Sequence, residues 1–175
     1  KQEYQDVISS YLGVQPIEIN SRYFTGMIRK RLYWTNIEIK PYETKDITLE
    51  KIIDKTIKYD RNVSYFKNTP IRPRRGREGI ITINPRCDNG KETGQRSRVY
   101  DITGFCPTIC ASLYNLNITQ DSIRYRKLSI NECEKLQGVP IDYTRHIPDT
   151  QRGKCLGNGW TIDVIAHILG GLKRF

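Results

Sequence analysis

The sequence predicts an α/β fold that carries a small inserted domain made mostly of short strands and loops. Apolar residues recur at helical spacing near both ends of the 175 residues, at 4–13 and 160–172. β-Branched and aromatic residues follow the first helix, at 16–19 and 31–37. Between residues 60 and 98, Arg, Asn, Gly and Pro dominate instead. We therefore expect an α/β body built from both ends of the chain and an insertion in its middle.

The first predicted element is a helix over 4–13, ended by Gly13, because glycine readily adopts the left-handed conformation that closes a helix. Its apolar residues are Tyr4, Val7, Ile8 and Tyr11. Two strands follow, at 16–19 and 31–37. A second amphipathic helix is predicted over 48–59. Its apolar face is formed by Leu49, Ile52, Ile53 and Ile57.

Two short strands, at 79–83 and 99–102, are the expected ordered elements of the middle region. After them, Ser129 and Glu132 have the spacing of a capping box, which predicts a helix to Gln137 with Gly138 as its C-cap. The last helix is predicted over 160–172. Its buried stripe is expected to consist of Ile162, Ile165, Ala166 and Leu169.

The charge balance favours a polyanionic partner. The chain has 29 Lys and Arg against 19 Asp and Glu, a net charge of +10. A merely soluble basic protein is the alternative. No apolar run approaches the roughly 20 residues of a membrane span, and the polar N-terminus shows no signal-peptide pattern. The absence of an initiator Met leads us to expect a piece of a longer protein.

The cysteines do not predict a metal site. The five cysteines form no C-x-x-C pair, and no second Cys/His pair with ligand spacing accompanies Cys106 and Cys110. We expect no metal, and reduced thiols.

The stretch Arg29-Lys30-Arg31-Leu32-Tyr33-Trp34, preceded by Ile19-Asn20-Ser21, is the first candidate site. Two arginines two apart in a strand point to one face, where their guanidinium groups hold a carbonyl oxygen and a phosphate together. The stretch resembles the Gln-x-Arg-x-Arg motif of DNA cytosine-5 methyltransferases, with Met27 at the position of the Gln. The resemblance implies that Arg31 contacts a flipped cytosine and that Arg29 supports the same pocket. A basic sheet edge is the alternative interpretation.

Two later stretches resemble the last two motifs of the same family. Residues 126–140, ending in Leu-Gln-Gly-Val-Pro, resemble the family's R-x-L-T-x-x-E…L-Q-G-F-P segment. Residues 151–165 resemble its final Q-R-x-x-x-L-G-N-x-W motif, which forms part of the S-adenosylmethionine pocket. The cofactor-binding residues implied are Gly157, Asn158, Gly159 and Trp160. On this motif alone, a plain turn that caps a helix is the competing interpretation.

The middle of the chain occupies the place of the family's target recognition domain. Tyr100-Asp101-Ile102-Thr103-Gly104 and Pro107-Thr108-Ile109-Cys110-Ala111 resemble its Y-x-I-x-G-x-x-P-T-L-T-A signature. Arginine-rich loops suit contacts with phosphates and base edges, although a solvated charge run is the default for such a stretch alone. The expected DNA-binding residues are Arg72, Arg74, Arg75, Arg77, Arg86, Arg96, Arg98, Thr108 and Ile109.

The resemblance implies the C-terminal part of a Rossmann-like methyltransferase domain. Residues 1–37 would end the catalytic domain, 38–125 would form the target recognition domain, and 126–175 would form a hinge segment and closing helix. The family's Phe-x-Gly-x-Gly, Pro-Cys-Gln and Glu-Asn-Val segments are absent from these residues, so we expect no catalytic cysteine and no activity of the chain alone.

The implied function is S-adenosylmethionine-dependent methylation of cytosine C5, as in restriction-modification. The implied partners are double-stranded DNA and an N-terminal methyltransferase half or subunit, in the cytoplasm of a bacterial or phage-infected cell, or in a eukaryotic nucleus. The alternative is a non-catalytic DNA-binding or accessory subunit. An RNA-binding protein is a weaker hypothesis, because no RNP-like aromatic motif occurs.

Overall fold

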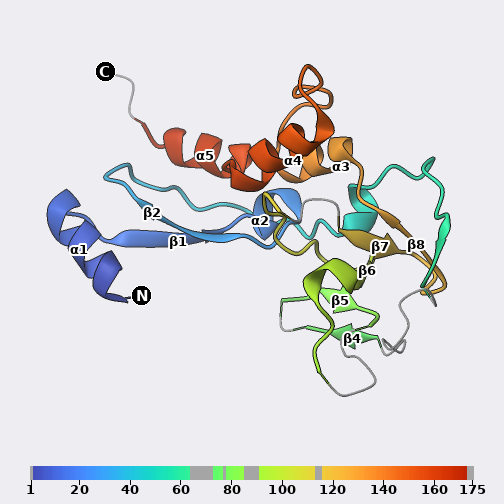
Figure 1. Cartoon of the computed structure of the whole chain (residues 1–175). Coiled ribbons are helices and arrows are strands. Elements are labelled where there is room, and N and C mark those ends of the chain that lie inside the picture. Colours follow the sequence, from blue (N-terminus) through green and yellow to red (C-terminus); the bar gives the residue numbers. More distant parts are fainter. Residues whose placement is uncertain (1, 64–72, 77, 85–90, 113–115, 173–175) are drawn as a thin grey trace.

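The computed structural model describes residues 2–63, 73–76, 78–84, 91–112 and 116–172, and its fold is mixed α/β (Figure 1). A long two-stranded hairpin with a helix at its outer end forms one side of the molecule. A six-stranded sheet forms the other side, and the C-terminal helices lie above the hairpin and the region between. In the described part of the chain, every helix falls short of the length and apolarity that crossing a bilayer requires.

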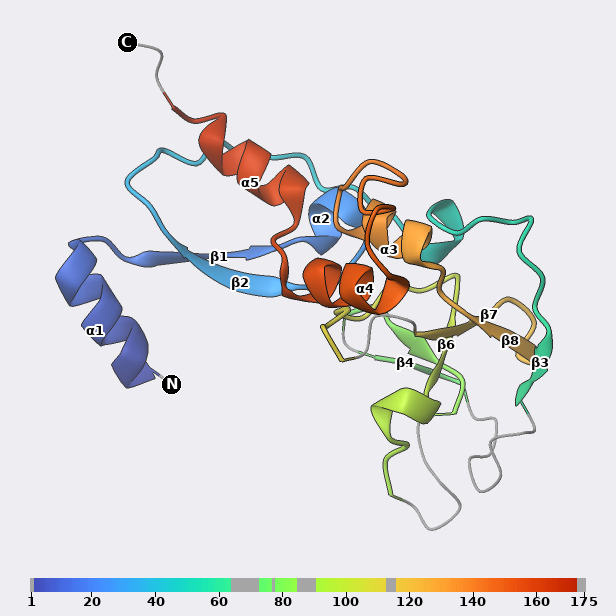
Figure 2. The same cartoon turned by 45° about the horizontal axis from the view of Figure 1, so that its top comes forward.

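The hairpin consists of β1 (Pro16–Asn20) and β2 (Lys30–Trp34), paired antiparallel from Pro16 opposite Trp34 to Asn20 opposite Lys30. The short helix α2 (Arg22–Thr25) lies in the connection between the strands. Helix α5 (Ile162–Leu169) runs along the hairpin in both views (Figure 2). Val164 and Ile168 of α5 pack on Ile19 of β1, so the two ends of the chain share one apolar cluster.

The six-stranded sheet has the order β3-β8-β7-β6-β5-β4, in which only β6 and β7 are parallel. Every strand in it is short. The strands are β3 (Arg61–Asn62), β4 (Arg74–Arg75), β5 (Ile81–Thr82), β6 (Val99–Asp101), β7 (Asn117–Thr119) and β8 (Arg124–Lys127). The 3₁₀ turn η3 (Gln95–Ser97) precedes β6.

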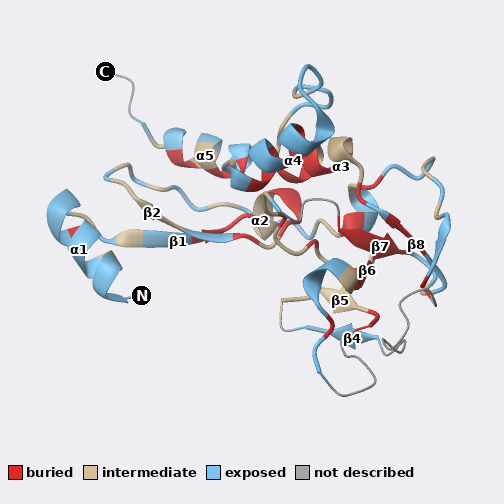
Figure 3. Ribbon diagram, viewed as in Figure 1, coloured by how far each residue is buried: buried red, intermediate tan, exposed pale blue. Residues whose placement is uncertain are grey.

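The largest apolar cluster joins the sheet to the hairpin connection and to the C-terminal helices (Figure 3). Ile118 of β7, Met27 from the connection and Leu136 of α3 are all fully buried in it. The position that a glutamine occupies in the resembling motif therefore holds an apolar side chain packed in the core.

Several predicted elements are confirmed. The first helix exists as α1 (Gln2–Leu12), and Gly13 follows it with φ +68 and an N–H bonded to the carbonyl of Ser9. Helix α3 (Ile130–Leu136) begins with the predicted capping box: Ser129 Oγ accepts from the N–H of Glu132, and the Glu132 carboxylate accepts from the N–H of Ser129. Gly138 follows α3 with φ +71.

The predicted helix over 48–59 is wrong. Only the 3₁₀ turn η1 (Leu49–Lys51) forms there. The N–H groups of Leu49 and Glu50 donate to the carbonyls of Gly104 and Ile102, and the N–H of Asp54 donates to the Glu132 carboxylate. The N–H groups of Leu49 and Glu50 would have no partner inside a helix, so their bonds anchor the first turn, whereas the N–H of Asp54 is diverted from the carbonyl that a continuing helix would use.

The end of the chain also differs from the prediction. Residues predicted as a turn belong to an additional helix, α4 (Asp149–Asn158). The last helix begins at Ile162 and ends at Leu169, and its buried side chains are Val164 and Ile168. Ile162 and Leu169 of the predicted stripe are 44% and 50% exposed, so the predicted face was wrong. The Thr161 hydroxyl donates to Gln137 just before α5 begins, and the contact of Val164 and Ile168 with Ile19 determines which face of α5 is buried.

A buried ion pair joins β8 to α3. Arg126 donates to both carboxylate oxygens of Glu132, at 2.8 and 2.7 Å, and the two side chains are 3% and 1% exposed. Burial alone would raise the pKa of Glu132. The hydrogen bonds from Arg126 and from the N–H groups of Ser129 and Asp54 outweigh burial and lower this pKa below its ordinary value.

We predict that Glu132→Gln lowers the free energy of unfolding by about 3–5 kcal/mol at neutral pH, because Arg126 would remain buried without a counter-charge. Urea titrations measure this difference, and Glu50→Gln at an exposed position is the control. The pKa of Glu132 is lower in the folded protein than in the unfolded chain. The stabilisation that its carboxylate provides is therefore complete above the pKa of the unfolded chain, and it is lost as the pH falls through the pKa of the folded protein. The difference in free energy of unfolding between wild type and Glu132→Gln should therefore decrease as the pH is lowered. A difference that stays constant would contradict this account.

Candidate functional site

The connection between β1 and β2 is a rigid turn built on Asn20. This buried side chain accepts hydrogen bonds at Oδ1 from the N–H groups of Arg22, at 3.2 Å, and Arg29, at 3.1 Å. Gly26 closes the turn with φ +77, and a Cβ there would meet the carbonyl oxygen of Ile47 at 2.1 Å. The turn therefore fixes where Arg29 enters the second strand.

The guanidinium of Arg29 is buried and bound only to backbone carbonyls among the described residues. Nη1 donates to Ile109 at 3.2 Å and Gly157 at 3.3 Å, and Nη2 donates to Gly157 at 3.3 Å and Gly159 at 2.9 Å. Burial, and then the neighbouring charge of Arg31, lower the pKa of Arg29. One side chain thus ties the hairpin, the loop at Ile109 and the end of α4 together.

Arg31 lies two residues further along and is exposed. Its Nη1 donates to the carbonyl of Lys30 at 2.7 Å. Arg29 and Arg31 both line a cavity of about 490 Å³ between β2, the end of α4 and α5. Asn158 and Trp160 line the same cavity. Four residues that the sequence singled out for two different roles therefore lie around one space.

The glycine of the final motif packs against protein. A Cβ at Gly157 would lie 2.2 Å from the amide nitrogen of Ala111 and 2.2 Å from the carbonyl carbon of Cys110. Asn158 is the last residue of α4 and lies before the start of α5 at Ile162. Trp160 follows it and is 70% exposed.

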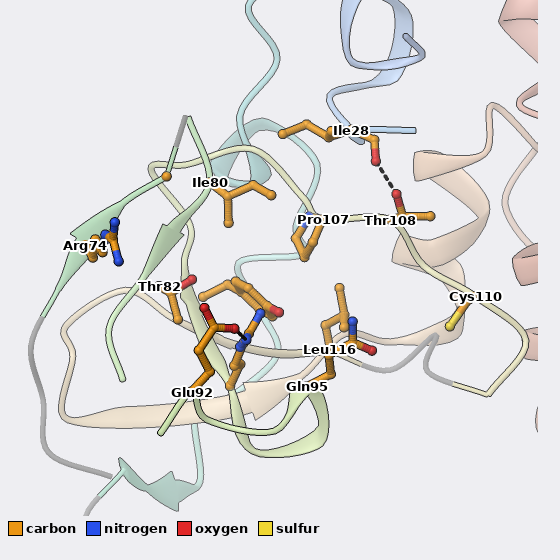
Figure 4. Close-up of a pocket in the computed structure, with 13 residues that line it drawn as sticks. Ile28, Arg74, Ile80, Thr82, Glu92, Gln95, Pro107, Thr108, Cys110 and Leu116 are labelled. Atoms are coloured by element: carbon orange, nitrogen blue, oxygen red, sulfur yellow. Dashed lines mark hydrogen bonds and ion pairs between the residues drawn. The ribbon is translucent and has the colours of Figure 1, made fainter. Parts of the chain in front are cut away.

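A second cavity, of about 640 Å³, lies between the β4–β5 hairpin and the loop 107–110 (Figure 4). Arg74 comes from one wall and Thr108 from the other, and the Thr108 hydroxyl donates to the carbonyl of Ile28. Glu92 and Gln95, which the sequence analysis did not select, reach into the same space. This cavity combines side chains of the kinds that read base edges.

The arginines proposed for DNA contact fall into two groups. Arg98 is engaged, since its Nη2 pairs with Glu92 at 2.9 Å and its Nε donates to Thr93 at 2.8 Å. The guanidinium groups of Arg74, Arg75 and Arg96 make no hydrogen bond or ion pair within the described residues. Ile109 is fully buried and accepts from Arg29 through its carbonyl. Arg72, Arg77 and Arg86 lie outside the described residues.

The cysteines in the described ranges form no disulfide with one another, and Cys106 and Cys133 are buried. Burial raises the pKa of Cys106 well above its ordinary value and that of Cys133 to about 12. Neither thiol is therefore prepared to act as a nucleophile near neutral pH. No group of potential metal ligands gathers in the part of the chain that is described.

Sequence reasoning missed two residues that organise this region. Glu78 bonds to both ends of the hairpin connection, and Gln137 links the Leu156 carbonyl to the Thr161 hydroxyl. A single acid at the end of an arginine run was the available signal for Glu78. For Gln137, the available signal was its place in the Leu-Gln-Gly-Val-Pro stretch that resembles a family motif.

Comparison with known families matches residues 2–174 to the model of C-5 cytosine-specific DNA methylase. The chain belongs to this family of cytosine-specific DNA methylases. A curated relative is the type II methyltransferase M.BanI of Aneurinibacillus aneurinilyticus, 26% identical over 145 residues. The match covers 82% of this chain and 32% of that protein, so the chain spans about a third of its relative's length.

Membership of the methylase family supports DNA cytosine methylation as the general chemistry, for which the family uses S-adenosylmethionine. Within this methylase chain, the contacts of Arg29 and Gly157 bring the loop 107–111 against the turn that follows α4. The two cavities therefore flank one shared wall.

We predict that Gly157→Ala lowers the free energy of unfolding by about 3 kcal/mol, the upper end of the usual cost of overpacking. The added methyl would overlap backbone atoms, which cannot move aside as a side chain can. Thermal or urea unfolding measures the change. Gly94→Ala is the matched control, since a Cβ there meets nothing within 4 Å. Equal stabilities of the two variants would show that α4 does not pack on the loop as described.

Proposed function

We propose that the chain is the DNA-reading and cofactor-closing part of a DNA cytosine-5 methyltransferase. The observation that carries this proposal is the cavity shared by Arg29, Arg31, Asn158 and Trp160. Two segments 128 residues apart meet there through Arg29. Family membership supplies the chemistry, and the shared cavity supplies a place where target base and cofactor meet.

In this proposal residues 1–37 and 126–175 belong to a Rossmann-like methyltransferase domain, and 38–125 form an inserted target recognition domain. The separate apolar cluster of the hairpin and α5 supports this division. Strands β3 to β7, with their short lengths and long connections, form the proposed recognition unit, and β8 crosses its boundary with the methyltransferase domain.

The residues of the first cavity fit one wall of an S-adenosylmethionine site. Asn158 offers amide donors and an acceptor for an amino-acid head group, and the exposed ring of Trp160 offers a face to an aromatic base or a cation. S-adenosylmethionine, when bound, supplies the methyl group. Gly157 and Gly159 shape the turn, because their carbonyls are held by Arg29.

Arg31 is the proposed contact to the flipped cytosine. Its guanidinium is exposed at the rim of the cavity and donates to the backbone carbonyl of the neighbouring Lys30. Donors placed at the O2 atom of the base stabilise the charge that develops while a thiolate adds to the ring. Arg29 is proposed as a positioning residue of the pocket, because both of its terminal nitrogens donate to backbone carbonyls.

The thiolate that attacks C6 of the cytosine comes, in this proposal, from an N-terminal methyltransferase half or subunit. Pro-Cys-Gln does not occur in these 175 residues. Cys106 and Cys133 are buried with raised pKa values. The chain alone should therefore give only background in a methyl-transfer assay on varied duplex DNA.

The second candidate is a non-catalytic DNA-binding subunit related to these methylases. The buried Met27 in place of the motif's Gln favours it. Methyl transfer by the chain mixed with a Pro-Cys-Gln-containing methylase half decides between the two. Turnover that requires both components supports the enzyme, and DNA binding without any turnover supports the accessory subunit.

Our prediction for DNA binding concerns Arg74 and Arg75, whose guanidinium groups are free in the described structure. The chain should bind duplex DNA with an affinity that falls steeply with salt, and each phosphate contact contributes about 0.9 to the slope of log K against log salt. Replacing both arginines with Ala should lower the slope by up to about 1.8, as two lost contacts would. Fluorescence anisotropy at several salt concentrations measures it, with the exposed Arg145→Ala as control. An unchanged slope would show that the hairpin only carries solvated charge.

A second prediction separates the two roles proposed for the shared cavity. In the two-component enzyme, Arg31→Ala should lower kcat by about 10²–10³, the typical cost of one lost oxyanion donor. Arg31→Lys should recover only part of this, because an ammonium lacks the planar fork. Asn158→Ala should instead raise the KM for S-adenosylmethionine and leave DNA binding unchanged. If Arg31→Ala mainly weakens cofactor binding, the assignment of Arg31 to the base is wrong.

A further inference from the structure

Glu78 fastens the arginine-bearing β4–β5 hairpin to a distant part of the chain. Its Oε1 pairs with Lys30 Nζ at 2.7 Å, and its Oε2 accepts from Asn20 Nδ2 at 3.3 Å. Its backbone carbonyl accepts from Arg22 Nη1 at 3.3 Å. All three bonds lead to the β1–β2 hairpin and its connection, although Glu78 itself belongs to the turn between β4 and β5.

The same turn is held from a second side by Phe105. Gly79 has φ +82, and a Cβ there would lie 2.8 Å from the Phe105 ring. The N–H of Phe105 donates to the carbonyl of Gly79 at 3.1 Å. The Arg22 guanidinium lies 4.4 Å from the centroid of that ring. Backbone contacts with Phe105 therefore hold the turn in place, and the Glu78 carboxylate links this turn to Lys30 of β2.

Asn20 makes Glu78 part of the turn that positions the candidate site. Its Nδ2 donates to Glu78, while its Oδ1 accepts from the N–H of Arg29. Lys30, the ion-pair partner of Glu78, stands between Arg29 and Arg31 in the sequence. A displacement of Glu78 would therefore alter the distance between the β4–β5 hairpin and the strand that carries Arg31.

Electrostatics makes the role of Glu78 testable. On a surface that binds phosphates, a carboxylate opposes binding, so removing it should strengthen contact with any DNA. A residue that positions the reading hairpin has the opposite effect on the preferred sequence, because misplaced side chains lose their base contacts. The two roles predict changes of opposite sign.

We propose that Glu78 is a positioning residue that sets the placement of the β4–β5 hairpin, with Arg74 and Arg75, relative to Arg31. Glu78 thereby determines how selectively the chain reads DNA sequence. This inference rests on the proposed function, since it presupposes that the hairpin contacts DNA.

The test compares binding of the whole chain to two duplexes. One is the sequence that the wild-type chain enriches from randomised duplexes, and the other is a scrambled duplex of equal composition. Glu78→Gln should lower the ratio of the two affinities at least about fivefold, the low end of what one lost base contact costs. Affinity for the scrambled duplex should stay equal or rise. Glu50→Gln is the matched control. It removes the same charge from an exposed glutamate, whose ion pair with Lys55 is long, at 3.9 Å.

A second variant pair tests the ion pair itself. Lys30→Gln should also lower the ratio, and the double variant Lys30→Glu/Glu78→Lys should recover part of it. A ratio unchanged in Glu78→Gln, or no recovery in the double variant, overturns the inference. So does a wild-type chain that binds DNA with no sequence preference, although DNA binding itself then stands. A wild-type chain that binds no DNA refutes the proposed function instead.

Discussion

The buried guanidinium of Arg29 holds together segments that the sequence keeps far apart. Four hydrogen bonds to the carbonyls of Ile109, Gly157 and Gly159 replace the water that a charge of this kind would otherwise require. Its pKa is lowered by burial, but a guanidinium stays protonated at any physiological pH. A permanent charge with fixed donor directions therefore joins the loop at Ile109 to the end of α4.

The close approach of backbones around this charge depends on residues that lack a Cβ. Gly157 lets α4 approach Cys110 and Ala111, and Gly26 lets the β1–β2 connection approach Ile47. In both cases the neighbour is protein backbone. The motif glycine therefore has a structural task here whichever ligand the adjoining cavity takes.

Charge is distributed unevenly over the surface that we assign to DNA. Arg98 is paired with Glu92, and Lys30 is paired with Glu78, whereas Arg74 and Arg75 are unpaired in the described structure. The count of 29 Lys and Arg thus overstates the number of cations available to phosphates. The two glutamates hold part of the basic surface in place, and Arg74 and Arg75 belong to β4, the strand at one end of the sheet (Figure 1).

The sequence by itself determined the elements whose signals are local. The capping box at Ser129 and Glu132 and the glycine after α1 rest on contacts between near neighbours, and the strands β1 and β2 follow from the propensities of their residues. Spacing and propensity therefore predicted them. The order of the motifs also indicated the family, which the match over residues 2–174 establishes.

Tertiary structure decided the rest, because long-range hydrogen bonds outweigh local preference. The predicted helix at 48–59 is replaced by bonds to Gly104, Ile102 and Glu132, and the face that α5 buries follows from its contact with Ile19. Exposure of the apolar residues of α1 likewise could not be read from their spacing. The roles of Arg29 and Glu78 depend on partners 128 and 58 residues away, respectively, and no pattern within a short window encodes such distances.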